Sequence, residues 1–253
     1  MVGTFLGIAA VACAPMSLRG SGSVGLDEVI RRNTLARGGA EALDRVRSLQ
    51  IDAEISEGGQ TLQGRWTATL DGRVRVDIYA DGKSVFSEGV DGAGGWMWTG
   101  GSAPAKPSVE AGRAALLNGA ENHLVGWHRF AGRGHKLALM PTETIDGISY
   151  HVVEVRYATG QVSYFYVDPV TWQAVRRRDE RAYHPDVDPT KQRVESRFYD
   201  FVLVDGVVAS HRSADFDLAT GKMLGSSRVL DRQINPPFAA DHFDRNRRAS
   251  ATL

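Results

Sequence analysis

Apolar and polar residues alternate over most of this chain, and Asp-Gly pairs interrupt the alternation at regular intervals. Side chains of a β-strand point to opposite faces in turn, so a period of two marks a strand with one apolar and one polar face. Residues 61–70 show this best, because their large apolar side chains share one face: Leu62, Trp66, Ala68 and Leu70. Asp71-Gly72 then turns the chain into a second alternating run, and Asp-Gly is a strong hairpin signal. The pattern predicts an antiparallel meander whose apolar face must be covered.

Repetition of this pattern predicts about a dozen strands. We expect them at residues 48–56, 61–70, 73–80, 83–90, 94–99, 135–140, 148–157, 161–167, 171–181, 192–204, 207–217 and 222–234. An amphipathic helix is expected from Leu26 to a stop at Gly38-Gly39, and a short second helix carries Ala42 and Leu43. Two more helices are expected at residues 109–117 and 122–130. These two are the natural cover for the apolar face of a mainly β fold.

The charge of the chain is balanced, with 30 Lys and Arg residues against 30 Asp and Glu residues. A sequence-independent nucleic-acid binder carries a basic excess, so we expect no nucleic-acid partner. Two basic runs, at residues 176–178 and 245–248, are interpreted as a solvated strand end and as part of a basic tail over residues 244–253.

The N-terminal residues predict export from the cytoplasm. An apolar run over residues 2–12 is too short to span a bilayer but fits the core of a secretory signal. Small residues then precede Cys13, the single cysteine, as at a bacterial lipoprotein processing site, where the cysteine is lipidated. An ordinary cleaved signal, or a merely apolar N-terminus, are the alternatives. We expect an export segment at residues 1–13, a Ser- and Gly-rich linker at 14–25, and one domain at 26–243, located in the periplasm or cell envelope and tethered to a membrane if Cys13 carries lipid.

No sequence motif supports catalysis. The chain lacks a Gly-x-Ser-x-Gly elbow, a phosphate-binding loop and a His-Glu-x-x-His pair, and one cysteine cannot form a cysteine-rich zinc site. The loop with His184, Asp186 and Asp188 has cation-binding residue types, but a tight solvated loop explains these residues as well, and we favour that interpretation. The chain is therefore predicted to be no enzyme and to use neither a metal nor a cofactor.

Aromatic residues recur on the predicted strands and on the second covering helix. Each one fits a packed core, but together they also fit a deep apolar cavity between a curved sheet and helices, and such cavities bury acyl chains. We predict that the cavity is lined by seven residues: Leu62, Trp66, Val76, Ile78, Trp96, Trp98 and Trp127.

Several short motifs, taken in order, resemble those of the Lol-type (LolA/LolB-like) bacterial lipoprotein carriers, also named outer-membrane lipoprotein-sorting proteins. They extend over residues 26–243 and are Ala36–Leu43, Gly64-Arg65-Trp66 leading to Arg73–Asp77, Asp91-Gly92 followed by Gly95–Trp98, Asp146-Gly147 with Tyr150, Tyr164–Pro169, and Tyr199-Asp200-Phe201 with Val204–Val207. The resemblance implies an unclosed antiparallel β-barrel of about eleven strands under a helical lid, which binds lipid or lipoprotein acyl chains without chemistry. Asp71-Gly72, where the family commonly has a proline, and the distinct segment 104–135 indicate a divergent member.

Two functional hypotheses follow. In the first, the protein is an envelope carrier that holds a lipid or an acylated lipoprotein in the cavity, in lipoprotein sorting or a related transport step. In the second, the core is solid and the protein is a structural or sensor domain. Its outer polar face, with Arg65, Arg73 and Arg75, would then bind another envelope protein.

Overall fold

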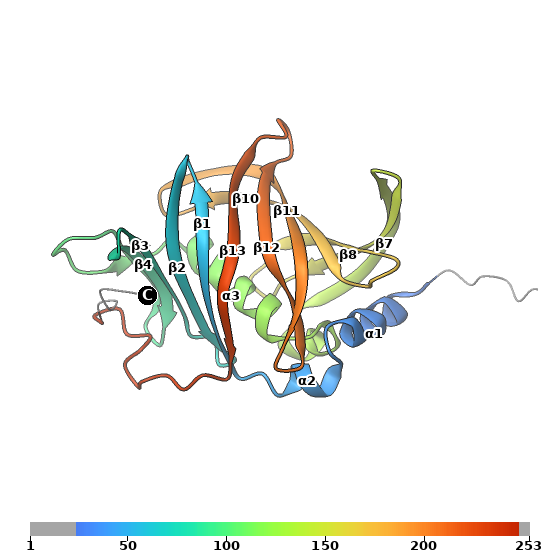
Figure 1. The fold of residues 1–253 in the computed structure, drawn as a ribbon, viewed down its shortest axis with the longest axis horizontal. Helices are drawn as coiled ribbons and strands as arrows, with labels where there is room; N and C mark the ends of the chain where they lie inside the picture. The colour runs from blue at the N-terminus through green and yellow to red at the C-terminus, as the bar shows by residue number, and fades with distance from the viewer. Residues whose placement is uncertain (1–23, 248–253) are drawn as a thin grey trace, which may run out of the picture.

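The structure, a computed structural model, describes residues 24–247 (Figure 1). Its helices are α1 (Leu26–Ala36), α2 (Ala40–Asp44) and α3 (Glu110–Leu124), with 3-10 turns η1 (Trp127–Arg129) and η2 (Ala131–Arg133). Its strands are β1 (Ser48–Glu57), β2 (Gln60–Thr69), β3 (Val74–Ala80), β4 (Lys83–Asp91), β5 (Gly94–Trp98), β6 (Lys106–Pro107), β7 (Lys136–Ile145), β8 (Ile148–Arg156), β9 (Val162–Val167), β10 (Ala174–His184), β11 (Asp188–Val204), β12 (Val207–Asp217) and β13 (Met223–Ile234).

All thirteen strands belong to one antiparallel sheet in the order β6-β5-β4-β3-β2-β1-β13-β12-β11-β10-β9-β8-β7. The sheet consists of two consecutive meanders, β1–β6 and β7–β13, which meet where β1 pairs with β13. The edge strands β6 and β7 are not paired with each other, so the curved sheet stays unclosed. This confirms the mainly β, unclosed antiparallel fold. The sheet has thirteen strands, where the sequence pattern predicted about a dozen and the family resemblance implied about eleven.

The hairpin turns have the backbone that the Asp-Gly signal predicts. Asp81, Asp146 and Asp205 all have φ near 50°, a left-handed conformation that Asp tolerates better than most residues. Each is followed by a glycine that also has positive φ. Two successive residues of this kind form the turn that matches the twist of the flanking strands, so the local sequence sets the hairpin register.

Helix α3 lies inside the curve of the sheet, and Figure 1 shows it behind β12 and β13. Its Leu116, Ala120 and Leu124 join Val74 and Ala68 in one buried core. Helix α1 and η1 extend this core toward β7–β9 through buried side chains such as Val29 and Trp127. The inner face of the sheet is thus the face that α3 covers.

The prediction of two covering helices is wrong in detail, because one helix spans nearly all of the segment predicted at 109–117 and only the first three residues of that predicted at 122–130. Helix α3 continues through Asn118 and Gly119, and it ends at Leu124 because Val125 is extended. Val125 is β-branched and Gly126 follows it, and both residue types weaken a helix. The remainder of the segment predicted at 122–130 forms the short turn η1.

After β13 the chain crosses to the outer face of the sheet and lies along β3 and β4 (Figure 1). Arg245 donates two hydrogen bonds to Asp91, at 2.9 and 2.7 Å, and the guanidinium of Arg75 donates to the carbonyl oxygens of His242 and Asp244. Residues expected to begin a basic tail therefore contact the sheet. The predicted export segment, Cys13 and most of the predicted linker lie outside the described residues. None of the helices within residues 24–247 has the length and hydropathy needed to cross a membrane.

Candidate functional site

The inner face of the sheet has an apolar side and a charged side. On the apolar side, Trp66 pairs with Ile51 of β1 and with Val76 of β3, and all three face α3. On the other side, Arg177 of β10 pairs with the core residue Phe165 and so also points inward. Side chains two residues apart share a face, so Asp179 and Arg181 point inward as well. The interior offers apolar and ionic surfaces opposite each other.

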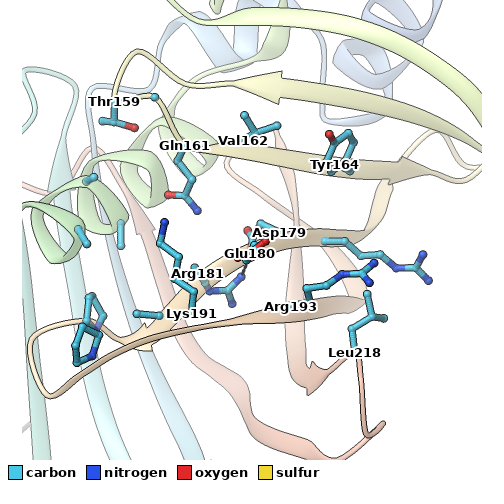
Figure 2. Close-up of a pocket in the computed structure, with 18 of the residues that line it drawn as sticks. Thr159, Gln161, Val162, Tyr164, Asp179, Glu180, Arg181, Lys191, Arg193 and Leu218 are labelled. Carbon is cyan, nitrogen blue, oxygen red and sulfur yellow. Dashed lines mark hydrogen bonds and ion pairs between the residues drawn. The ribbon is translucent and has the colours of Figure 1, made fainter.

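A lateral opening of about 1020 Å³ leads between α3 and strands β9–β11. It exists because β9 begins at Val162 whereas β10 runs on to His184, and the last pair between them is Ser163 with Asp179. Its lining includes the outward-facing Tyr164 and Arg178 as well as the inward-facing Asp179. Figure 2 shows Gln161 and Val162 on one side of this opening and Asp179 and Arg181 on the other. Small residues of α3 also line it: Ala111, Ala114 and Ala115.

Two arginines share one carboxylate at the rim of the opening. Asp179, which is buried, forms ion pairs with Arg181 and, at 3.2 Å, with Arg177. It also accepts a hydrogen bond of 3.1 Å from the Ser163 hydroxyl. Arg181 reaches further to Asp215 of β12, at 3.5 Å. Because buried carboxylates stay ionised only with such partners, this network fixes β10 beside the gap in the sheet.

The far side of the opening is fixed by amides. The Asn118 side-chain amide on α3 donates to the Gln161 side-chain oxygen at 2.8 Å, and the Thr159 hydroxyl donates to the Asn118 oxygen at 3.0 Å. These bonds hold the β8–β9 turn against the helix. The two rims of the opening are therefore held by different networks.

The tip of the β10–β11 hairpin bridges the upper end of the interior. Asp186 at this tip accepts a hydrogen bond of 2.7 Å from the backbone N–H of Val109, at the start of α3. A side chain at Gly112 would collide with the same carboxylate, so the glycine permits the approach. His184 pairs with Glu57 at the end of β1. Asp186 and His184 of this loop therefore have partners within the chain. No group of His, Cys, Asp and Glu within residues 24–247 is arranged to hold a metal ion.

Three solved structures resemble this arrangement over almost their whole length. The first is a LolA superfamily protein from Nitrosomonas europaea, with a TM-score of 0.57 and 12% identity, and the match covers 87% of this chain and 98% of that chain. The second is a domain from Vibrio parahaemolyticus described as an outer membrane lipoprotein-sorting protein, with a TM-score of 0.56, 12% identity, and coverage of 87% of this chain and 96% of that chain. The third is a DUF1329 family protein from Desulfovibrio piger, with a TM-score of 0.55, 12% identity, and coverage of 86% of this chain and 96% of that chain. The fold is that of the LolA superfamily. No protein-family model matches the sequence, and no curated protein matches it. The resemblance to the Lol-type carriers is therefore confirmed for the fold, at a sequence identity that marks the chain as divergent.

The LolA-like sheet places the seven predicted cavity residues at two separate surfaces. Leu62, Trp66, Val76 and Ile78 lie on the inner face and are only partly buried. Trp127 is buried in η1, with its ring 5.5 Å from that of Phe165. A cavity-lining role for these five stays a prediction.

Trp96 and Trp98 lie on the outer face, which corrects their expected place beside Trp66. Trp96 pairs with Gly89, and Gly89 pairs with Arg75, so the indole lies on the face opposite to that of Trp66 and Val76. The Arg75 guanidinium lies 5.4 Å from the Trp96 ring centre, and the C-terminal segment covers this side of the sheet. Both tryptophans are buried, on the face of the sheet opposite to the one that α3 covers.

Sequence reasoning missed the residues that surround the lateral opening. The basic run 176–178 was interpreted as a solvated strand end, yet Arg177, and after it Asp179 and Arg181, point into the LolA-like interior. Six consecutive charged residues place charges on both faces of a strand, and a strand in the middle of a sheet has one face turned inward. A run of charged residues on a central strand is therefore the sequence signal that could have predicted charged side chains in the interior.

The arginines expected on an outer working face are bonded within the chain. Arg65 forms a two-bond pair with Asp52, at 2.7 Å for both bonds, and Arg73 pairs with Asp71 at 3.0 Å. Arg75 is buried against Asp77. These arginines therefore give no specific support to the hypothesis of a partner-binding face.

Glu88 is expected to make stability depend on pH. It points inward from β4, and burial, followed by the nearby charge of Asp186, raises its pKa to about 7, although His184 acts in the opposite sense. The folded protein then holds a proton that the unfolded chain releases above its usual pKa of 4.5. Stability from this group should fall as pH rises from 4.5 to 7 and stay constant above.

Glu88→Gln should remove this dependence and raise the free energy of unfolding at pH 8 by at most about 3 kcal/mol. Urea unfolding of both proteins between pH 4.5 and 8 measures the effect. Identical pH profiles for the two proteins would show that Glu88 ionises freely in the folded state.

Proposed function

We propose that this chain is a cell-envelope binding protein that carries a lipid, or the acyl chain of a lipoprotein, between its curved sheet and α3, in lipoprotein sorting or a related transport step. The observation that carries the proposal is the opening of about 1020 Å³ that leads between α3 and β9–β11. An acyl chain that enters there and is buried against the apolar inner face gains roughly 0.8 kcal/mol per methylene group, so binding needs few polar contacts. No bond is made or broken in this function.

Two further observations support the proposal. Apolar side chains on the inner face remain only partly buried, among them Leu62, Trp66 and Ile78, and an acyl chain would cover them. One structure with the same fold is described as an outer membrane lipoprotein-sorting protein, which is the same class of activity. Binding within the envelope, where acyl chains must cross an aqueous compartment, fits a sheet that shields them from water.

The test is extraction of the purified protein with organic solvent, followed by mass spectrometry and by titration of the delipidated protein with a fluorescent fatty acid. A stoichiometric lipid, or saturable uptake of the probe, is the expected result. An empty protein that also rejects the probe would overturn the proposal and favour the solid-core domain that binds a partner protein.

Narrowing the opening should weaken uptake without unfolding the protein. Ala115 on α3 is exposed and lines the opening, so an Ala115→Trp side chain would narrow it. We expect the affinity for the fluorescent fatty acid to fall at least tenfold, about 1.4 kcal/mol, with little change in the melting temperature. Ala219→Trp, at an exposed turn between β12 and β13, is the matched control. Unchanged uptake in Ala115→Trp would show that ligand enters elsewhere.

A further inference from the structure

Two arginines inside the curved sheet have no carboxylate partner. None of the ion pairs found within residues 24–247 includes Arg37 or Arg232. Arg37 donates only to backbone carbonyls of the segment around α3, those of Val125 at 3.3 Å and Asn122 at 3.4 Å. Arg232 donates to the carbonyl oxygen of Ser210 at 3.2 Å, and its buried Nε has no hydrogen-bond partner.

These cations converge with two rings on the inner face. Arg232, Ile51 and Trp66 lie on one rung across β13, β1 and β2, so about 10 Å separates the outer two backbones. His123 of α3 lies against Trp66, with ring centres 5.1 Å apart. Arg37 holds the carbonyls on both sides of His123 in sequence, which brings its guanidinium to the same region.

The positive charges of this cluster affect the pKa of His123. Burial, then the charges of Arg232, Arg37 and Arg177, lower the pKa of His123 to about 3, so the ring is neutral at physiological pH. The pKa values of Arg37 and Arg232 are lowered to about 10, chiefly by burial, and both therefore stay charged at neutral pH. His123 is nevertheless exposed, so solvent reaches the space that the cluster faces.

Acidic groups on the opposing strands do not neutralise the cluster. Asp179 is shared by Arg177 and Arg181, and Asp215 pairs with Arg181. Both of these aspartates are thus used by Arg177 and Arg181. A further inward acid, Glu88, lies near Asp186 and His184, so no carboxylate within residues 24–247 pairs with Arg37 or Arg232. A buried charge without a partner is costly, and a ligand that carries the opposite charge would offset that cost.

We propose that Arg232 and Arg37, with the neutral ring of His123, form the anion-binding end of the ligand site, and that the ligand is an amphiphile whose carboxylate or phosphate contacts these groups. The inference rests on the proposed lipid-binding function and adds to it the charge and the orientation of the ligand. The head group lies against the cluster, and the acyl chain follows the apolar rungs of Trp66 and Val76. A neutral lipid of equal length would leave both arginines unpaired.

The test is competition against a fluorescent fatty acid at pH 8, with oleate, oleyl phosphate, methyl oleate and inorganic phosphate as separate competitors. We expect both anionic amphiphiles to bind at least tenfold more tightly than methyl oleate, and inorganic phosphate to compete weakly. Arg232→Gln should reduce the affinity for the anionic amphiphiles about tenfold and leave that for methyl oleate unchanged, while Arg232→Lys should restore most of the loss. Arg228→Gln, on the same strand in an exposed pair with Glu54, should change neither.

The outcomes separate this inference from the function on which it rests. Equal affinity for oleate and methyl oleate, unaffected by Arg232→Gln, would overturn the anion site while lipid binding stands. Inorganic phosphate that competes as well as oleyl phosphate would also overturn it, because the cluster would then bind a free anion. Failure of every amphiphile to bind would instead contradict the proposed function. Thermal unfolding of each variant checks folding, and Arg232→Gln should not lower the melting temperature, since it removes an unpaired charge.

Discussion

Arg75→Ala is expected to lower the free energy of unfolding by about 3–5 kcal/mol, because it leaves a buried carboxylate without its counterion. The side chains of Arg75 and Asp77 are only 2% and 6% exposed, and their closest nitrogen and oxygen atoms are 2.8 Å apart. Ser87 donates a further hydrogen bond to Asp77 at 2.5 Å. Arg75 also binds the carbonyl oxygens of His242 and Asp244, so its loss should release the C-terminal segment as well.

Urea unfolding followed by tryptophan fluorescence measures the loss, since Trp96 lies beside Arg75. Arg228→Ala, which removes an exposed ion pair, should cost less than about 1 kcal/mol. The double change Arg75→Met with Asp77→Leu should recover much of the stability, because it removes both charges and keeps apolar volume. A loss no larger than that of Arg228→Ala would show that water reaches Asp77 in the folded protein.

Gly38→Ala should lower the free energy of unfolding by about 2–5 kcal/mol, the second large effect. Alanine would have to adopt a left-handed backbone conformation there, and its side chain would also collide with a neighbouring backbone. Gly38 has φ of +111°, and a Cβ atom there would lie 1.9 Å from the carbonyl oxygen of Gly206. The same contact seats the β11–β12 hairpin on the junction of α1 and α2, where the Val208 N–H donates to the Arg37 carbonyl at 3.0 Å.

The neighbouring glycine provides the control for this prediction. Gly39 also has positive φ, at +89°, but a Cβ atom there would meet nothing within 4 Å. Gly39→Ala should therefore cost only the backbone term, about 1–2 kcal/mol. Thermal and urea unfolding of the two variants compare them directly. Equal losses would mean that the hairpin moves away from Gly38 at little cost.

The sequence predicts most of this fold because the information is local. Alternation defines each strand, and Asp-Gly pairs such as Asp81-Gly82 define the turns that join neighbours. The helix boundaries were less accessible, because α3 packs through small residues such as Ala120, and these gave no continuous apolar stripe across Asn118 and Gly119.

The faces of strands depend on partners that are distant in sequence. Trp96 and Trp98 were expected inside because they are large and apolar, but the inward positions of β5 hold Gly95 and Met97, near Arg113 of α3. The outer face can be apolar here because residues after β13 cover it. No local sequence pattern predicts that these distant residues pack on this face. The charged inner face of β10 was missed for the same reason, since only the pairing with β9 and β11 tells which side of Arg177 is inside.

The joining of β1 to β13 at the centre of the sheet has a consequence for how this protein is made. Each meander forms from neighbours in sequence, but β1 finds its second partner only after all other strands have been synthesised. Until then β1 has one unpaired edge of ten residues, and this edge can template pairing with another chain. Long-range pairing of this kind is slow to form. The nascent protein therefore passes through a stage in which the future middle of its sheet is an exposed edge with a risk of aggregation, in addition to the edges that the finished sheet retains.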